Sequence, residues 1–299
     1  MFVSAQKMVS GIDSFSLIAV PFLFVAGLLM NSGGIAKRLI NSRTVGSWKV
    51  PGSLALTNIA GNAMFGSISG SGIAAATAIG GVMLPLEKEQ KYDEGFAAAV
   101  NIATAPVGQL IPPTTAFIVF SAAGGGASVA ALFMAGWIPG LLWAACCMVV
   151  AFFYARKQGY VIKRDKLTAK IVGKTIWDAI PSLFLVVIII GGILSGKFTP
   201  TEASGVAVAY AFILSVFIYR TIKLSEIPKL LVDAAVMTTI VMLIIGASSV
   251  LSFVMSFTGL PAAISKLVLG ISSNKYVILL ILNIFLLIVG TFMDMAPAL

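Results

Sequence analysis

Two runs of residues that disfavour a continuous helix lie within apolar stretches of the chain. They are the Gly/Ser run GSISGSG at 66–72 and the proline-flanked run APVGQLIPP at 105–113. In lipid, unwound backbone persists only where it is buried in protein or lines a solvated cavity. Carbonyl groups freed at the end of one helical arm can coordinate a hard cation, and N–H groups at the start of the next can receive an anion. Paired broken helices build the substrate and ion sites of secondary transporters, so the two runs indicate a transport site.

The first run combines two residue types with different uses. Its three glycines allow close backbone approach and unusual φ values, and its three serines supply hydroxyl groups. The alternative is a turn between two helices in which small residues permit tight packing. Three serines at bilayer depth favour the ligand site over that alternative. Among these residues we assign Ser67, Gly70 and Gly72 as candidate substrate contacts.

The second run removes backbone donors from the middle of a span. Pro106, Pro112 and Pro113 carry no N–H group, and Gly108 permits the chain to bend. A helix continuing through Pro112 would leave an upstream carbonyl unpaired, and a sodium ion can satisfy several such carbonyls at once. The alternative is a proline kink repaired by a neighbouring Ser or Thr. Three prolines and a glycine exceed what a kink needs, so we favour an ion site.

Asp294 is the one acid that falls inside an apolar segment. A charge at the bilayer centre costs about 3 kcal/mol on insertion scales, which makes an intramembrane acid a functional candidate. The alternative is that Asp294 lies nearer the membrane surface than the hydropathy indicates. No Lys or Arg falls in mid-span, so an anionic substrate would be held by helix N-termini, hydroxyl groups and bound cations. The chain has no histidine and almost no acid expected to be buried, so we predict coupling to Na⁺ rather than to protons, with no other cofactor.

Composition identifies an integral membrane protein. Of 299 residues, 59% are hydrophobic and 10% are charged, whereas soluble domains carry about 25% charged residues. The net charge of +9 could indicate nucleic acid or an anionic membrane face, and its distribution along the chain favours the membrane. Cys146 and Cys147 are adjacent, so we expect packing or lipid-facing residues rather than a disulfide.

Apolar stretches predict an all-α multi-span bundle. The expected spans are 14–30, 93–121 (broken), 127–155, 177–195, 200–220, 229–256 and 276–290. Between the first two lies 51–85, whose arms 51–65 and 73–85 would each rise about 20 Å as helix, against roughly 30 Å of hydrocarbon. We therefore predict a re-entrant hairpin with its tip at 66–72 rather than two spans.

The distribution of positive charge supports this topology. Sixteen of the twenty Lys and Arg residues fall in 31–49, 87–95, 156–176 and 220–229, which share one face if 51–85 enters and leaves on the same side. Cytoplasmic loops carry such an excess, so we assign this face to the cytoplasm. This charge distribution requires that 51–85 begin and end on the same side of the membrane. A re-entrant hairpin and a pair of short spans would both satisfy that requirement.

Two local patterns bear on the second half of the chain. Thr199-Pro200-Thr201-Glu202 is typical of a capping box, so Glu202 is expected to start a helix rather than carry protons.

The other pattern is a weak repeat at an offset of 225 residues. Met30, Gly34, Ile35 and Leu39 match Met255, Gly259, Leu260 and Ile264. Five crossings separate the copies, so the second would be inverted. We expect a single membrane domain over 1–299 that is a fragment of a longer protein. Residues 14–155 would form the first repeat, and 177–299 the start of the inverted second repeat, ending within its hairpin.

Several long motifs resemble the large membrane subunit of TRAP transporters, and the resemblance covers nearly the whole chain. They are GSISGSGIAAATAIGGVMLP, KYDEGFAAAVNIATAPVGQLIPPTTAFIVF, LFMAGWIPG, FTPTEASGVAVAYA and GTFMDMAPAL. The resemblance implies an elevator-type, sodium-driven importer of carboxylated solutes in the bacterial inner membrane. It further implies two partners, a small membrane subunit and a periplasmic substrate-binding protein.

The resemblance also implies site residues. One Na⁺ site would use Ser69, Ser71, Gly108, Ile111 and Pro113. A symmetric second site would involve Gly290, Thr291 and Asp294. Many relatives carry an aspartate where this chain has Ala75, so any role of that aspartate in the relatives cannot be assigned to this chain.

The predicted function is therefore import of small organic anions, such as C4-dicarboxylates or sialic acid, by a subunit that moves its hairpin-bearing core against a scaffold. The alternatives are a channel or structural scaffold and an intramembrane hydrolase. A serine nucleophile needs a general base. The chain has no histidine, and Lys88 and Lys91 are expected in a cytoplasmic loop.

Overall fold

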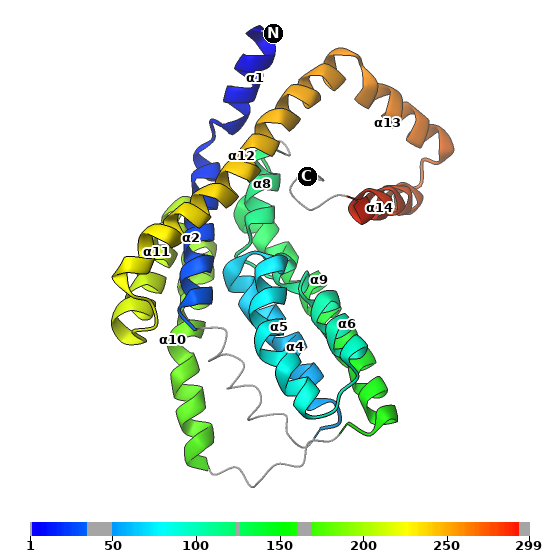
Figure 1. The fold of residues 1–299 in the computed structure, drawn as a ribbon. Helices are drawn as coiled ribbons and strands as arrows, with labels where there is room; N and C mark the ends of the chain where they lie inside the picture. The colour runs from blue at the N-terminus through cyan, green and yellow to red at the C-terminus, as the bar shows by residue number, and fades with distance from the viewer. Residues whose placement is uncertain (1, 35–49, 124–125, 161–168, 293–299) are drawn as a thin grey trace.

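The computed structural model describes residues 2–34, 50–123, 126–160 and 169–292, and within these ranges every regular element is a helix. In chain order they are α1 Phe2–Ile12, η1 Phe15–Ile18, α2 Ala19–Ser32, α4 Ser53–Ser69, α5 Gly72–Glu89, α6 Glu94–Thr104, α7 Val107–Leu110, α8 Thr115–Ala123, α9 Val129–Gln158, α10 Ala169–Leu194, α11 Pro200–Phe212, η2 Ile213–Ile218, η3 Leu224–Glu226, α12 Ile227–Phe257, α13 Leu260–Ile271 and α14 Lys275–Phe292 (Figure 1).

Five stretches of the described chain are long and apolar enough to cross a membrane. They are Phe15–Ser32, Val129–Gln158, Pro200–Ile218, Leu224–Phe257 and Lys275–Phe292. A sixth span is Glu94–Leu110 together with Thr115–Ala122, which are bent by 49° at their junction. The prediction of an all-α multi-span protein with a broken helix is confirmed.

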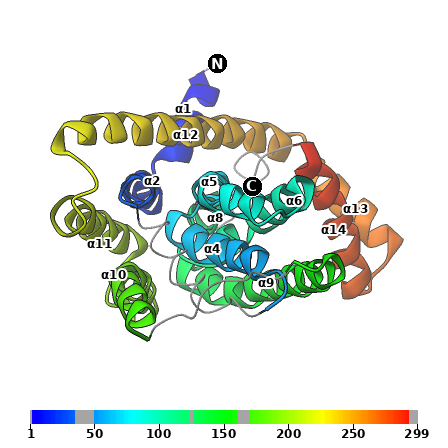
Figure 2. The same cartoon turned by 60° about the horizontal axis from the view of Figure 1, so that its bottom comes forward.

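The helices pack around two hydrophobic cores. The first joins α2, α10, α11 and α12 through residues such as Val20, Leu185 and Ala207, and it also takes in α8 and the start of α9. The second joins α4, α5, α7 and most of α9 through residues such as Ile59 and Ile79. Figure 2 shows the two groups side by side, with α12 running across both. The bend at 111–114, between α7 and α8, lies where the broken helix passes from the second core to the first.

The predicted hairpin is present, and its helices are longer than expected. Helix α4 continues through most of the Gly/Ser run and α5 continues past Pro85, so only Gly70 and Ser71 are unwound. The expected break over 66–72 is therefore too wide. The left-handed conformation of Gly70 (φ 63°) ends α4, and the Ser71 hydroxyl accepts a bond from Ala74 N at 3.3 Å to start α5. One glycine and one capping serine suffice for the turn, so the flanking residues keep their helical bonds.

The tip of the hairpin contacts residues inside two spanning elements. Ser69 O is 3.2 Å from where a Cβ on Gly27 would lie, and Gly27 is inside the span Phe15–Ser32. On the other side, Thr115 at the break donates to Gly70 O at 3.3 Å. A tip that ends inside these spans does not cross the membrane, so α4 and α5 form a re-entrant hairpin.

Helix α2, which lines one side of the tip, is tied to α11 and the connection that follows it. The Ser215 hydroxyl donates to Leu29 O at 3.1 Å, and the Thr221 hydroxyl donates to Gly33 O at 2.9 Å. Ser215 lies in η2, a π-helical stretch, and this wider turn is a known way to reposition side chains within a helix. The two bonds connect carbonyl groups at the end of α2 to a segment distant in sequence.

The predicted capping box at α11 is confirmed. Glu202 N donates to the Thr199 hydroxyl at 3.2 Å, and Thr199 N donates to Glu202 Oε2 at 2.8 Å. Glu202 is thus a residue that starts a helix, as expected.

Removing this cap should weaken the start of α11. We expect Thr199→Ala to destabilise the protein by about 1 kcal/mol, the usual loss for an N-cap residue. Thr239→Ala on α12, where an exposed hydroxyl bonds only to Ala235 O of its own helix, is the control and should change stability little. Thermal unfolding of both variants measures the difference, and equal midpoints would contradict the role of the cap.

Helices α13 and α14 lie apart from the two cores and have no buried residues (Figure 1). Gly34 after α2 and Gly259 after α12 have nearly the same left-handed backbone, with φ of 69° and 71°. These glycines are one of the four pairs on which the inverted repeat was predicted. Residues 35 and 39 lie outside the described residues, and the division into repeats stays a prediction.

Candidate ion and substrate site

The hairpin and the broken helix meet backbone to backbone. A Cβ on Gly108 would collide with Gly66 Cα, and one on Gly66 would collide with Gly108 Cα. Only glycine at both positions permits this approach. It brings α4 and α7 into direct contact just before each chain unwinds. The sequence runs 66–72 and 105–113 are therefore neighbours in space, as predicted.

The bonds at the tip hold its three residues in a compact turn. Gly70 N donates to Gly66 O at 2.7 Å, while Ser71 N lies 3.4 Å from Ser69 Oγ. Ser69 Oγ donates in turn to Ser71 O at 3.4 Å. These last two contacts are long, so the Ser69 hydroxyl can turn toward a ligand at small cost.

The broken helix forms the opposite wall of the candidate site, facing the hairpin tip. Pro113 O lies 3.6 Å from the position of a Cβ on Gly70. Gly72, the first residue of α5, faces the Gln109 side chain and Ala105 O across the break, with a Cβ position 3.3 Å from Gln109 Cδ. Carbonyl oxygens of the broken helix thus lie close to the tip, and carbonyl and hydroxyl oxygens are the ligands that hard cations prefer.

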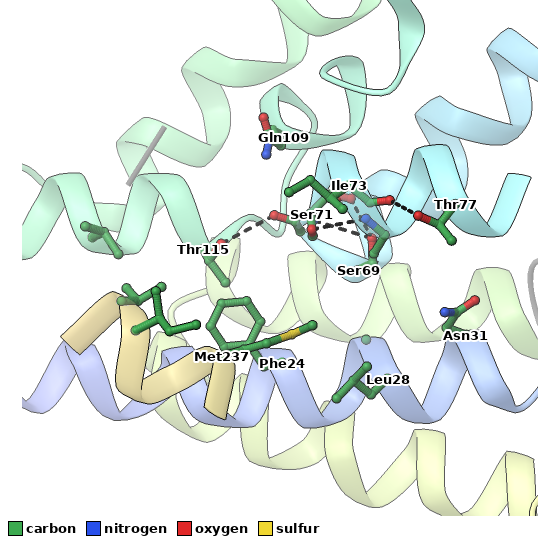
Figure 3. A pocket seen from close by; sticks show the side chains of 16 residues that line it. Phe24, Leu28, Asn31, Ser69, Ser71, Ile73, Thr77, Gln109, Thr115 and Met237 are labelled. Atoms are coloured by element: carbon green, nitrogen blue, oxygen red, sulfur yellow. Dashed lines mark hydrogen bonds between the residues drawn. The ribbon is translucent and has the colours of Figure 1, made fainter. Parts of the chain in front are cut away.

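A cavity of about 420 Å³ opens at this junction. Its polar wall comes from the hairpin tip, α5 and the broken helix, and α2 and α12 contribute mainly apolar side chains (Figure 3). The lining residues are Phe24, Gly27, Leu28, Asn31, Ser69, Gly70, Ser71, Ile73, Ala74, Thr77, Gln109, Thr115, Val119, Met237, Ile240 and Val241. None of them carries a charge, as the absence of Lys and Arg from mid-span predicted. The volume suits a small organic molecule.

The predicted site residues fall into three groups. Ser69, Gly70 and Ser71 line the cavity. Gly72, Gly108, Ile111 and Pro113 are buried directly behind it, in the first turn of α5 and in the break. The remaining described ones are elsewhere: the Ser67 hydroxyl donates to Met64 O within its own helix, and Gly290 and Thr291 lie on α14, apart from this cavity.

Asp294, the other member of the predicted second site, lies outside the described residues. Thr291 donates to Leu287 O at 2.8 Å, the back-bond typical of a threonine within a helix. The roles assigned to all these residues stay predictions.

A polar cluster behind the tip was not predicted. The Asn62 side-chain NH₂ reaches four acceptors: Asn58 Oδ1 at 3.0 Å, Thr104 Oγ1 at 2.9 Å, and Asn101 Oδ1 and O at 3.0 and 3.2 Å. Asn101 Nδ2 donates to Ala76 O at 2.9 Å, so the cluster joins α4, α5 and α6. Asn58 and Asn62 are four residues apart in an apolar arm, and that spacing on one helix face was the available signal.

Three further residues that line the cavity, Gln109, Thr77 and Asn31, were not predicted from the sequence. Gln109 lies within the proline-flanked run, where the prolines and the glycine give the stronger signal. Glu87 was assigned to a cytoplasmic loop, whereas it belongs to α5 and is fully buried.

The fold and the site define a multi-pass helical membrane protein with a re-entrant hairpin whose tip faces a broken helix. The chain belongs to the DctM component family of the tripartite ATP-independent periplasmic (TRAP) transporters, which matches residues 1–299. It is a multi-pass protein of the bacterial inner membrane, and the named relatives are permease subunits.

Three relatives illustrate the match. The uncharacterized protein YgiK of Salmonella typhimurium is 47% identical over 99% of this chain and 68% of its own length. The sialic acid TRAP transporter large permease protein SiaM of Vibrio cholerae is 37% identical over 97% of this chain and 68% of its own. The C4-dicarboxylate TRAP transporter large permease protein DctM of Rhodobacter capsulatus is 36% identical over 97% and 69%. The chain thus spans about two thirds of each of these relatives.

Proposed function

We propose that the protein is the large membrane subunit of a sodium-coupled importer of small organic anions. The observation that carries this proposal is the meeting of the hairpin tip with the broken helix beside a cavity of about 420 Å³. A small membrane subunit and a periplasmic substrate-binding protein are the proposed partners, in keeping with the family. The relatives named for sialic acid and C4-dicarboxylate support a carboxylate as the transported group.

The proposed Na⁺ ligands come from both sides of the junction. Ser69 and Ser71 would contribute from the tip, and the backbone of Gly108, Ile111 and Pro113 from the break. Ile111 is extended (φ −85°, ψ 118°) rather than helical, which frees carbonyl groups of the preceding turn from helical bonding. A bound cation would offset the lack of a basic side chain in the cavity, and the free N–H groups at the start of α5 would receive the carboxylate.

The movement that we propose follows from the two cores. The hairpin and α7 would shift against α2, α11 and α12, which pack together in the first core. The bonds from Ser215 and Thr221 further tie the end of α2 to the segment that follows α11. The cavity lies between these groups, so such a shift would expose it to one side of the membrane and then the other. The inverted repeat would supply a second hairpin and a second ion site that includes Gly290, Thr291 and Asp294.

Replacing Na⁺ tests the coupling directly. In proteoliposomes that contain the full-length subunit with its partners, we expect uptake to saturate with substrate and to fall to background when K⁺ replaces Na⁺. Uptake that continues undiminished in K⁺ would rule out sodium coupling. Flux that does not saturate would indicate a channel instead.

A further inference from the structure

Glu87 is a buried acid that the proposed transport site does not use. It lies in the last turn of α5, in the hairpin base and outside the spanning segments, and its exposed fraction is 0%. Its only described side-chain bond is from Asn58 Nδ2 to Oε1 at 3.5 Å, and Oε2 has no hydrogen-bond partner among the described residues. An ionised carboxylate needs several donors, so this environment favours the neutral acid.

The surroundings of Glu87 offer no compensating charge among the described side chains. The charged groups at this end of the hairpin are all exposed: Lys88 and Glu89 on α5, Lys91 and Asp93 in the connection, Glu94 on α6, and Arg156 and Lys157 on α9. Helix α4, which packs on Glu87, carries no charged residue. Lys88 is paired instead with Glu94 at 2.7 Å on the surface.

The remaining titratable side chains near this end are tyrosines. Tyr92 is buried and stacks on Tyr160 with ring centroids 4.3 Å apart, and Tyr154 is exposed. Burial raises the pKa of Tyr92 to about 12, and Glu87 contributes a smaller rise. Tyr92 is therefore neutral over the range in which a carboxyl group titrates.

A chain of polar side chains leads from Glu87 to the break in the helix. Asn58 bonds to Glu87, Asn62 bonds to Asn58, and Asn62 also reaches Thr104, the last residue of α6. Asn62 O lies 3.1 Å from where a Cβ on Gly108 would be. Every step of the side-chain path is within hydrogen-bond distance, and all its members are buried.

We propose that Glu87 is a proton-binding site built into the base of the hairpin, linked by the Asn58–Asn62–Thr104 chain to the helix break. A proton from the aqueous side of the hairpin base binds the Glu87 carboxylate and gives the neutral acid. Ionisation places a poorly solvated charge at the Glu87 end of this series of hydrogen-bonded side chains. The charge loosens the packing of the hairpin on α6 and α7. The site is a property of the packed hairpin and does not depend on sodium coupling.

Burial raises the pKa of Glu87 from 4.5 to about 7, and the bond from Asn58 acts in the opposite direction. The raised value means that the unfolded chain ionises first as pH rises. The contribution of the neutral acid to stability is complete below about pH 4.5, is lost between there and about pH 7, and then stays constant.

Infrared spectroscopy of the full-length subunit tests proton binding. We expect a protonated-carboxyl C=O band that disappears as pH rises through about 7 and is absent in Glu87→Gln. The matched control Glu89→Gln, an exposed acid on the same helix, should keep the band. Asn58→Ala should shift its titration to higher pH, because it removes the bond that lowers the pKa. A band that persists unchanged in Glu87→Gln would overturn the proposal.

Thermal unfolding and uptake test the consequence for the hairpin. The unfolding midpoint of the unmodified protein and of Glu89→Gln should fall from about pH 5 to about pH 8, whereas that of Glu87→Gln should change far less. Uptake by the unmodified protein should fall as pH rises on the side of the membrane that the hairpin base faces. Uptake by Glu87→Gln should lose that dependence. Identical pH profiles of unfolding or of uptake in the unmodified protein and Glu87→Gln would refute the link to the break, whatever the sodium dependence.

Discussion

Gly108→Val should abolish uptake while leaving membrane insertion intact. The substituted side chain begins with a Cβ that collides with Gly66 Cα, and backbone cannot move aside as a flexible side chain can. The hairpin tip would separate from the break, and the two segments could no longer form the proposed ion site together. A displacement of about 1 Å costs a preorganised site about 100-fold, so we expect at least that loss of uptake.

A matched control is available on the same hairpin. Gly81 on α5 is exposed, and no atom of the described residues lies within 4 Å of where its Cβ would be, so Gly81→Val should transport normally. Gly66→Ala should resemble Gly108→Val, because the contact is mutual. Uptake by reconstituted protein, with insertion checked by membrane fractionation, distinguishes these outcomes. Normal uptake by Gly108→Val would show that the close approach is not needed for transport.

Asn62→Leu should have the largest effect on stability. Leucine has nearly the same size but donates no bond, so buried acceptors on Asn58, Asn101 and Thr104 lose a donor. A buried acceptor left unsatisfied costs about 1–3 kcal/mol, and the two hydrogens of the Asn62 amide serve more than one acceptor. We expect a total loss of about 3 kcal/mol, because more than one acceptor is affected.

The loss should be measured as a fall in the thermal unfolding midpoint of the full-length subunit. Gln90→Leu makes the same change from amide to leucine at an exposed position after α5, and should leave the midpoint nearly unchanged. If Asn62→Leu unfolds at the same temperature as Gln90→Leu, the amide cluster does not stabilise the hairpin.

Local chemistry explains what could be predicted from the sequence. Proline and glycine act on the backbone at their own positions, so a break within 105–113 and a turn within 66–72 follow from residue type alone, although the bend is confined to 111–114 and the turn to Gly70 and Ser71. The capping box at Thr199 depends on four consecutive residues and was predicted for the same reason. Hydropathy and charge likewise identify the spans, because lipid imposes the same requirement on each span separately.

The width of the tip and the length of α5 could not be predicted in this way. Residue type alone predicts that Gly66 and Gly72 belong to an unwound run, but both are helical and serve close packing against α7 and the break. A glycine gives the same local signal whether it permits a turn or a close contact. Only the position of the neighbouring helix distinguishes the two uses.

The sequence by itself determined that this chain is a helical membrane protein with a re-entrant hairpin and a broken span, because these features depend on residues close together in the chain. Tertiary structure alone decided that Gly66 meets Gly108, that Asn62 and Asn101 together join three helices, and that Glu87 is buried although charged neighbours surround it in sequence. The physical reason is that burial and hydrogen bonding between distant segments depend on how helices pack. The same packing sets the solvation, and with it the protonation, of a carboxyl group.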